Sequence, residues 1–453
     1  MSASSIINVT ELIDRRPVGA LQVRIIVLCG LVALLDGFDV LSIGLAAPEM
    51  ADTLHIAPNL FGTIFSAALL GLMLGAFALG PVADQIGRRR VLIGATAVFG
   101  IFTILTADAA TLPQLLLFRF LAGFGLGGAM PSFISLAAEY TPRPRRGTVV
   151  ALLYTGFPFG GMIVGLLGPR LIDTFGWPSL FYIGGVLPLV MCLLLVLLLP
   201  DSIGFLVAKG AASRDIRNLV TRIDPAVEIA ADCEFVISEE KRMPGMPLWH
   251  LFKQGRTVGT LLLWFSYFVT FLILVTNVSW TPILFRQAGI DVAQSAAAIA
   301  IFSFGSVIGT PLAGFLVNRR TSSIVLPALF IGGALMLGAV GYGASSTAMA
   351  IVLQGFAGFF LGAGSSGIIA LAALFYPTVI RSTGIGWAMG MGRFGSFVGP
   401  LYVGMLVEWG WDIGDTFAAL AAPALCAALF TALIGAGRLH QDSDADVAIE
   451  AGP

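Results

Sequence analysis

Long apolar runs that contain no Asp, Glu, Lys or Arg follow one another along the chain. A membrane-spanning helix needs about 20 such residues, and six of the runs are long enough: Leu54–Ala83, Gly147–Pro169, Thr174–Pro200, Thr257–Phe285, Val292–Asn318 and Thr416–Gly437. A further run, Thr321–Ile380, has room for two spans. Isolated charges interrupt three more spans, around Asp36 and Asp39, around Arg119 and around Arg393, and a short run covers Val91–Ala107. The pattern predicts an all-α membrane protein with twelve transmembrane helices.

A charged segment in the middle of the chain separates two similar halves. We expect a six-helix bundle over residues 1–200, a cytoplasmic linker over 201–255, a second six-helix bundle over 256–437 and a cytoplasmic tail over 438–453. An offset of 235 residues aligns Ala122-Gly123-Phe124 with Ala357-Gly358-Phe359, and Arg146 with Arg381. The repeat predicts two halves related by pseudo-two-fold symmetry, an arrangement typical of transporters that rock around a central site.

Composition supports this interpretation and sets the orientation. The chain is 57% hydrophobic and 11% charged, whereas soluble proteins have about 25% charged residues. With these spans, only Arg170 and Arg286 of the 25 Lys and Arg fall on the side opposite the termini, and Arg119 and Arg393 fall inside helices. Basic residues accumulate on the cytoplasmic side, so both termini of this multi-pass inner-membrane protein are predicted to be cytoplasmic. The net charge of −1 does not suggest nucleic-acid binding.

Asp36 and Asp39 are the sharpest candidates for proton coupling. Three residues apart, they lie on one face of the first helix, and two anions so close in a medium of low dielectric repel one another, which favours proton uptake by one of them. His55, His250 and His440 all lie outside the predicted spans, so the carboxylates would carry the proton. The alternative is that both are structural ion-pair partners.

Arg119 is the predicted charge partner of these carboxylates. At about 1.5 Å per residue, Asp39 lies about 22 Å beyond Arg24, and Arg119 about 10 Å inward from Leu112 at the opposite surface. In a hydrocarbon core about 30 Å thick, the two depths nearly coincide. The pairing requires that the first and fourth helices be neighbours.

The second half lacks most of these charges. At the repeat offset Arg119 aligns with Gln354, and at an offset one residue shorter Asp84 meets Asn318. No acidic counterpart of the first-helix carboxylates is found in the seventh span. We therefore expect proton coupling mainly in the first half.

Arg393 is the deep charge of the second half and a candidate anchor for an anionic substrate. Its planar guanidinium group matches a carboxylate with two hydrogen bonds, although it could instead neutralise an acidic side chain in the other half. The aromatic residues Phe38, Trp280 and Trp387 could stack on a ring. Trp is also common at membrane interfaces and Phe is an ordinary filler of such helices, so packing is the better explanation for any one of them.

A further group of charges is predicted at the cytoplasmic ends of the helices. Asp84 and Arg88 lie between the second and third helices, and Glu139 and Arg146 between the fourth and fifth. We expect them to pair as a cytoplasmic gate. The alternative, a general excess of basic residues on the cytoplasmic side, explains the arginines but not the acids.

Three segments resemble motifs of the major facilitator superfamily. Gly80–Arg90 resembles the loop between its helices 2 and 3, Arg119–Gly127 its fourth-helix motif, and Pro200-Asp201-Ser202 the signature after its sixth helix. The resemblance covers essentially the whole chain and implies the major facilitator fold.

Within that superfamily, the chain resembles the aromatic acid:proton symporters. Asp36-Gly37-Phe38-Asp39, Arg381-Ser382-Thr383-Gly384 and Gly392-Arg393-Phe394-Gly395 carry the similarity. It implies proton-driven uptake of an aromatic carboxylate such as a hydroxybenzoate, protocatechuate, gentisate or a phenylpropanoid acid. It also implies that transport depends on Asp36, Asp39, Asp84, Arg119, Glu139, Arg381 and Arg393, with Arg381 assigned to the cytoplasmic gate.

The sequence thus predicts a secondary transporter that takes up a small aromatic acid together with protons by alternating access. The nearest alternative is a proton-coupled antiporter that exports drugs or metabolites; a sensor that binds a ligand without accumulating it is another. A membrane-embedded enzyme is disfavoured because no set of nucleophile, base and metal ligands stands out in the spans. We expect no cofactor, no metal and a monomer.

Overall fold

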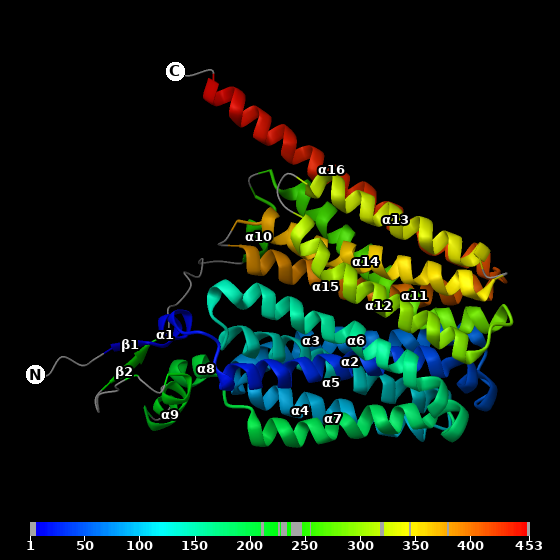
Figure 1. Cartoon of the computed structure of the whole chain (residues 1–453), viewed down its shortest axis with the longest axis horizontal. Helices are drawn as coiled ribbons and strands as arrows, with labels where there is room; N and C mark the ends of the chain where they lie inside the picture. Colours follow the sequence, from blue (N-terminus) through cyan, green and yellow to red (C-terminus); the bar gives the residue numbers. More distant parts are fainter. Residues whose placement is uncertain are drawn as a thin grey trace, which may run out of the picture. The chain divides into compact units, whose positions relative to one another are not determined.

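The computed structural model is an almost wholly helical protein, shown in Figure 1. It describes residues 6–209, 213–224, 227, 233–236, 247–253, 255–317, 321–343, 346–377 and 380–450. The short elements are β1 (Ile6–Asn8), α1 (Val9–Arg15), η1 (Pro58–Leu60), α8 (Ile203–Ala208), α9 (Ser213–Ile223), β2 (Glu234–Val236) and α10 (Pro247–His250).

Twelve of the described helices have 20 or more residues, which confirms the prediction of an all-α membrane protein with twelve transmembrane helices. They are α2 (Ala20–Thr53), α3 (Phe61–Ile86), α4 (Arg88–Ala107), α5 (Leu112–Glu139), α6 (Arg143–Phe175), α7 (Pro178–Leu198), α11 (Thr257–Gln287), α12 (Val292–Leu316), α13 (Ser322–Gly343), α14 (Thr347–Phe375), α15 (Arg381–Glu408) and α16 (Ile413–Glu450). All except α15, which contains Arg393, have a window that is long and apolar enough to cross a membrane.

Local chemistry sets several helix ends. The Thr111 hydroxyl accepts a hydrogen bond from the backbone N–H of Gln114 at the start of α5, and Asp291 does the same for Gln294 at the start of α12, at 2.7 Å. Such side chains satisfy backbone donors that have no partner within the helix. Between α3 and α4, Gly87 has a φ of 101°, a conformation readily adopted only by glycine. This residue allows α4 to start directly after α3 ends.

The chain divides into two compact units. The first comprises Met1–Asp39, Leu70–Gly160 and Pro178–Arg242, and the second comprises Val40–Leu69, Gly161–Trp177 and Met243–Pro453. Within the second unit, the parts of α2, α3 and α6 farthest from the linker are grouped with α11 to α16.

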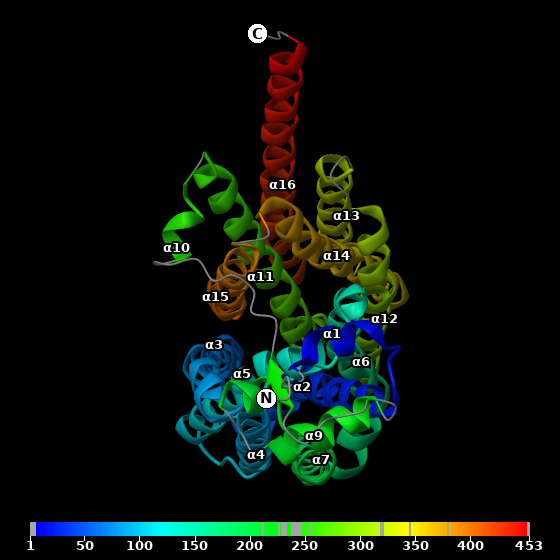
Figure 2. The same ribbon diagram turned by 90° about the vertical axis from the view of Figure 1, so that its left-hand side faces the viewer.

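In the first unit, the N-terminal segment and the linker share one hydrophobic core with the helices. The strands β1 and β2 pair in parallel, with Ile7 opposite Phe235, and Figures 1 and 2 show them beside α9. Val9 of α1 and Val220 of α9 belong to the same buried cluster as Leu136 of α5. The linker residues of this cluster therefore pack on the first unit.

Close helix contacts at glycines recur in the two units. A Cβ atom added at Gly75 of α3 would collide with the carbonyl oxygen of Phe124 on α5, and one added at Gly309 of α12 would collide with that of Phe359 on α14. Phe359 follows Phe124 by the repeat offset of 235 residues. Small residues permit this approach of helix backbones in membranes, so both halves use the same helix contact.

We expect Gly75→Ala to lower the melting temperature of the purified protein markedly. The added methyl group has no space between α3 and α5, and overpacking typically costs about 1–3 kcal/mol. Gly94→Ala is the matched control, because a Cβ added at that helical position meets nothing within 4 Å. Equal melting temperatures for the two variants in detergent would show that the close contact does not limit stability.

Candidate functional site

A buried ion pair joins α2 to α5 in the first unit. Arg119 forms a bidentate interaction with Asp39, in which one guanidinium nitrogen lies 3.2 Å from Oδ1 and another contacts Oδ2. Both side chains are 1% exposed. The Thr103 hydroxyl of α4 donates a third hydrogen bond to Asp39 Oδ1 at 3.1 Å, and the guanidinium carbon of Arg119 lies 5.5 Å from the centre of the Phe181 ring. The structure therefore brings the predicted partners Arg119 and Asp39 together.

Glycines hold the carboxylate-bearing part of α2 tightly against α6. A Cβ atom added at Gly37 would collide with the backbone of Phe157, and one added at Gly160 with the backbone of α2 at Leu34. Asp36, one helical turn before Asp39, is also buried. The close contact fixes the height and rotation of α2, and thereby the position of both carboxylates.

The second unit has an uncharged pair between the corresponding helices. Gln354 of α14 donates to Asn277 Oδ1 at 3.3 Å and to the Thr281 hydroxyl at 3.2 Å, and it accepts a hydrogen bond from Asn277 at 3.0 Å. Asn277 and Thr281, both on α11, are buried. The sequence had paired Arg119 with Gln354 but did not identify Asn277, because a neutral polar residue in an apolar span gives a weak signal.

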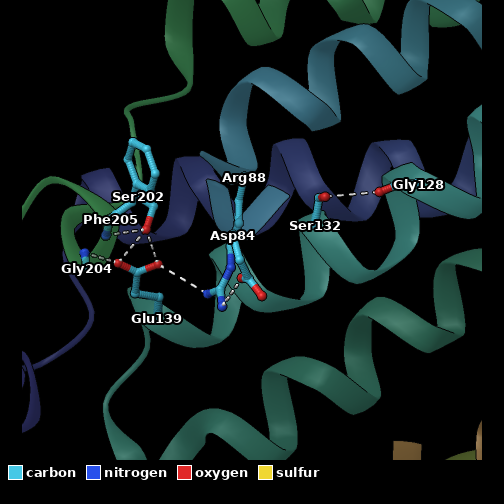
Figure 3. Close-up of polar contacts among 8 residues, drawn as sticks. All are labelled: Asp84, Arg88, Gly128, Ser132, Glu139, Ser202, Gly204 and Phe205. Atoms are coloured by element: carbon cyan, nitrogen blue, oxygen red, sulfur yellow. Dashed lines mark hydrogen bonds and ion pairs between the residues drawn. The ribbon is translucent and has the colours of Figure 1, made fainter. Parts of the chain in front are cut away.

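Glu139, at the end of α5, is the centre of a polar network near the linker (Figure 3). The Ser202 hydroxyl contacts its two oxygens at 3.0 and 2.7 Å, and the backbone N–H of Gly204 donates to it. Arg88 lies 3.6 Å from Glu139 and 3.6 Å from Asp84. The acid thus links the ends of α3, α4 and α5 to α8, and three of the predicted gate residues lie together.

The other two predicted gate residues make matching contacts in different units. Arg146 donates to the carbonyl oxygen of Thr141 at 3.0 Å, and Arg381 to that of Tyr376 at 3.3 Å. Each arginine therefore binds the carbonyl five residues before it. Asn318, the predicted counterpart of Asp84, lies outside the described residues.

Arg393 lies on α15 next to a close contact with α11. A Cβ atom added at Gly395 would collide with the carbonyl oxygen of Phe268, so the arginine is carried by a helix pressed against its neighbour. Of the three aromatic candidates, Trp387 is 43% exposed and stacks on Trp264 with 5.8 Å between ring centres. Phe38 and Trp280 are both buried.

Trp280 belongs to a set of contacts that the sequence did not predict. Its indole N–H donates to the carbonyl oxygen of Pro400 at 3.2 Å, and its ring meets Phe65 edge-on at 5.8 Å. The Ser66 hydroxyl donates to the carbonyl oxygen of Phe397 at 2.8 Å.

At the end of α2 farthest from the linker, Asp52 forms a salt bridge with Arg286 of α11. Among the contacts of Trp280, Ser66 and Asp52, only the salt bridge had a signal in the sequence, namely the isolated position of Arg286 among the basic residues. The carbonyl groups that Trp280 and Ser66 bind are determined by helix packing, which the sequence does not reveal.

A membrane bundle of twelve helices with an internal six-helix repeat is an arrangement of secondary transporters. A profile of the Major Facilitator Superfamily matches residues 29–320 and 263–446. The chain therefore belongs to the major facilitator superfamily.

Two relatives within the superfamily are similar to the chain over almost its whole length. The chain is 35% identical over 427 residues to the 4-hydroxybenzoate transporter PcaK of Pseudomonas putida, covering 94% of this chain and 95% of the relative. It is 34% identical over 434 residues to the gallate transporter of Pseudomonas putida, covering 96% of each. Both relatives transport aromatic acids. The chain is accordingly a membrane-spanning transporter rather than an enzyme, as predicted.

The fold is also found among solved structures. The xylose transporter XylE from E. coli, in a partially occluded inward open conformation, superposes with a TM-score of 0.71 at 18% identity, covering 91% of this chain and 97% of XylE. This similarity confirms the major facilitator fold.

We expect Asp39→Asn and Arg119→Gln, made singly, each to destabilise the protein by about 3–5 kcal/mol, because each leaves a buried polar or charged group without its partner. The double variant should melt at a higher temperature than either single variant, because it recreates the amide pair that Asn277 and Gln354 form in the second unit. If the double variant loses as much stability as the two single variants together, the two residues are not energetically coupled.

Proposed function

We propose that the protein takes up a small aromatic carboxylate together with protons, by alternating access across the inner membrane. The observation that carries this proposal is the fully buried Asp39–Arg119 pair, with Asp36 one turn away on the same helix. Ionisable groups inside a membrane are costly and are retained mainly where they act on ions or substrates. The aromatic acid class is supported by the relatives named for 4-hydroxybenzoate and gallate.

Proton binding to the carboxylates is the proposed coupling step. With Asp39 ionised, the pair is balanced, and the carboxylate receives hydrogen bonds from Arg119 and Thr103. A proton taken up from outside neutralises a carboxylate and weakens its attraction to the guanidinium group, which lets α2 and α5 rearrange. Release of the proton to the cytoplasm restores the pair. Without a proton, the intact ion pair holds α2 to α5. With a proton but no substrate, movement is opposed by the unbalanced buried charge of Arg119.

Arg393 is the proposed anchor of the substrate carboxylate, and Trp387, partly exposed on the same helix, is a proposed contact for the ring together with Phe38. Trp280 is assigned a different role from the predicted one, because its indole N–H and ring are engaged by Pro400 and Phe65. We assign it to the contacts that close the side opposite the linker.

The proposed gates lie at the two ends of the helices. On the linker side, which we take to be cytoplasmic together with both termini, the gate comprises Asp84, Arg88, Glu139, Arg146 and Arg381. On the opposite side, the salt bridge between Asp52 and Arg286 closes the path together with the contacts of Trp280 and Ser66. The transport unit is a monomer.

Uptake into proteoliposomes under an imposed inward proton gradient tests the function. We expect accumulation of 4-hydroxybenzoate or gallate that a protonophore abolishes. Export driven by the same gradient would instead identify an antiporter, and binding with neither accumulation nor counterflow would identify a sensor. If no aromatic acid shifts the melting temperature or enters vesicles, the proposed substrate class is wrong.

Arg393→Lys should raise the KM for the aromatic acid about tenfold, equivalent to about 1.4 kcal/mol of binding. Lysine keeps the charge but loses the planar fork that binds a carboxylate with two hydrogen bonds. Arg170→Lys is the matched control, because Arg170 is exposed on α6 outside the proposed site. The same KM for Arg393→Lys and wild type would exclude a direct contact between the guanidinium group and the substrate.

The closure opposite the linker can be tested with paired cysteines. In a background lacking the four native cysteines, Asp52→Cys and Arg286→Cys are combined and bridged with a short bifunctional thiol reagent. Bridging should stop uptake, because the outward-open state requires the two helix ends to separate, and a cleavable reagent should allow recovery. The single-cysteine variants treated alike are the control. If the bridged protein takes up substrate as fast as the untreated protein, the helix ends at Asp52 and Arg286 do not need to separate during transport.

A further inference from the structure

The two buried pairs occupy equivalent places in the repeat. Arg119 and Gln354 are separated by the same 235 residues as Arg146 and Arg381, which make the same contact in their two units. Each pair joins the first long helix of its half to the fourth, α2 to α5 and α11 to α14. Within each unit the pair is almost inaccessible, with Gln354 1% and Asn277 2% exposed.

The two pairs differ in whether they can bind a proton. The Asp39–Arg119 pair loses its charge balance when the carboxylate takes up a proton, whereas carboxamides do not ionise in the physiological range. The amide pair is also well satisfied: both N–H groups of Gln354 are used, and the Thr281 hydroxyl that accepts one of them donates to the carbonyl oxygen of Asn277 at 2.6 Å. Its strength is therefore independent of pH.

The helices around this amide pair supply few groups that titrate. Among the described residues, α12 and α14 contain no ionisable side chain. On α11 itself the ionisable residues are Tyr267 and Arg286. Among residues whose side chains the structure describes, those on the elements packed against α11 and α14 are Glu49, Asp52, Tyr342, Arg381, Arg393, Tyr402, Glu408, Asp415 and Cys426. Along α11, Tyr267 and Arg286 lie about 15 and 13 Å from Asn277 at about 1.5 Å per residue.

From these contacts we infer that the Asn277–Gln354 pair is the non-titrating copy of the Asp39–Arg119 pair and confines proton coupling to the first half. It keeps α11 bound to α14 in every protonation state, so only the α2–α5 connection changes with proton uptake. Asn277 and Gln354 are thus positioning residues that limit the number of protons moved with each substrate. This inference rests on the proposed proton symport.

The test restores the charged pair in the second half with Asn277→Asp and Gln354→Arg together. Proteoliposomes, with the membrane potential clamped at zero, are loaded at several pH gradients, and the accumulation of 4-hydroxybenzoate is measured at steady state. The slope of the logarithm of accumulation against the pH difference reports the number of coupled protons. We expect the slope of the double variant to be larger than that of wild type by one proton per substrate.

A second double variant tests the inference even if the charged double variant does not fold. Asn277→Leu with Gln354→Met removes both polar partners, which can be nearly neutral for stability. We expect this variant to transport more slowly but with the wild-type slope. A changed slope would place the amide pair in the proton path and overturn the inference.

A charged double variant that accumulates substrate with the wild-type slope would overturn the inference as well. Wild-type protein that shows no accumulation under a pH gradient would instead refute the proposed symport, and this inference with it. The two failures are therefore distinguished by the wild-type measurement alone.

Discussion

A charge buried in a membrane protein must be balanced inside the protein, and the Asp39–Arg119 pair is where this constraint is most severe. Both side chains are 1% exposed, so neither can be solvated by water when the other is lost. Thr103 and the Phe181 ring supply the remaining favourable contacts, a hydrogen bond to the carboxylate and an aromatic face for the guanidinium group. The packing of α2, α4, α5 and α7 in the first unit is therefore tied to the charge state of one pair.

The glycine contacts make that pair geometrically possible. Because Gly37 and Gly160 allow α2 and α6 to touch through their backbones, Asp39 is carried at a fixed height rather than on a loosely packed helix. The contact of Gly75 with Phe124, which lies inside the fourth-helix motif Arg119–Gly127, secures α5 in the same manner. Close helix packing of this kind is set by the spacing of small residues.

Much of the fold and part of the site follow from the sequence, for identifiable reasons. The twelve apolar spans can be recognised in the sequence because the thickness of the bilayer fixes their length. The pairing of Asp39 with Arg119 follows because the two residues lie at nearly equal depths in the membrane on two different helices. The contacts of Glu139 with Ser202 and Gly204 could not be predicted, since they depend on how the chain turns after α7. Asn277 was missed because it is uncharged and lies three residues away from the aligned position of Asp39.

In the proposed cycle, charge balance also relates the proton to the substrate. When Asp39 is ionised, the buried pair with Arg119 has no net charge, and proton uptake by Asp39 leaves one positive charge inside the protein. A carboxylate that enters at that stage brings one negative charge and restores neutrality. An amide pair such as Asn277–Gln354 contributes nothing to this balance in either state. In the proposed cycle the proton therefore makes the interior receptive to an anion, and one titratable pair in one of the two halves is sufficient for this balance.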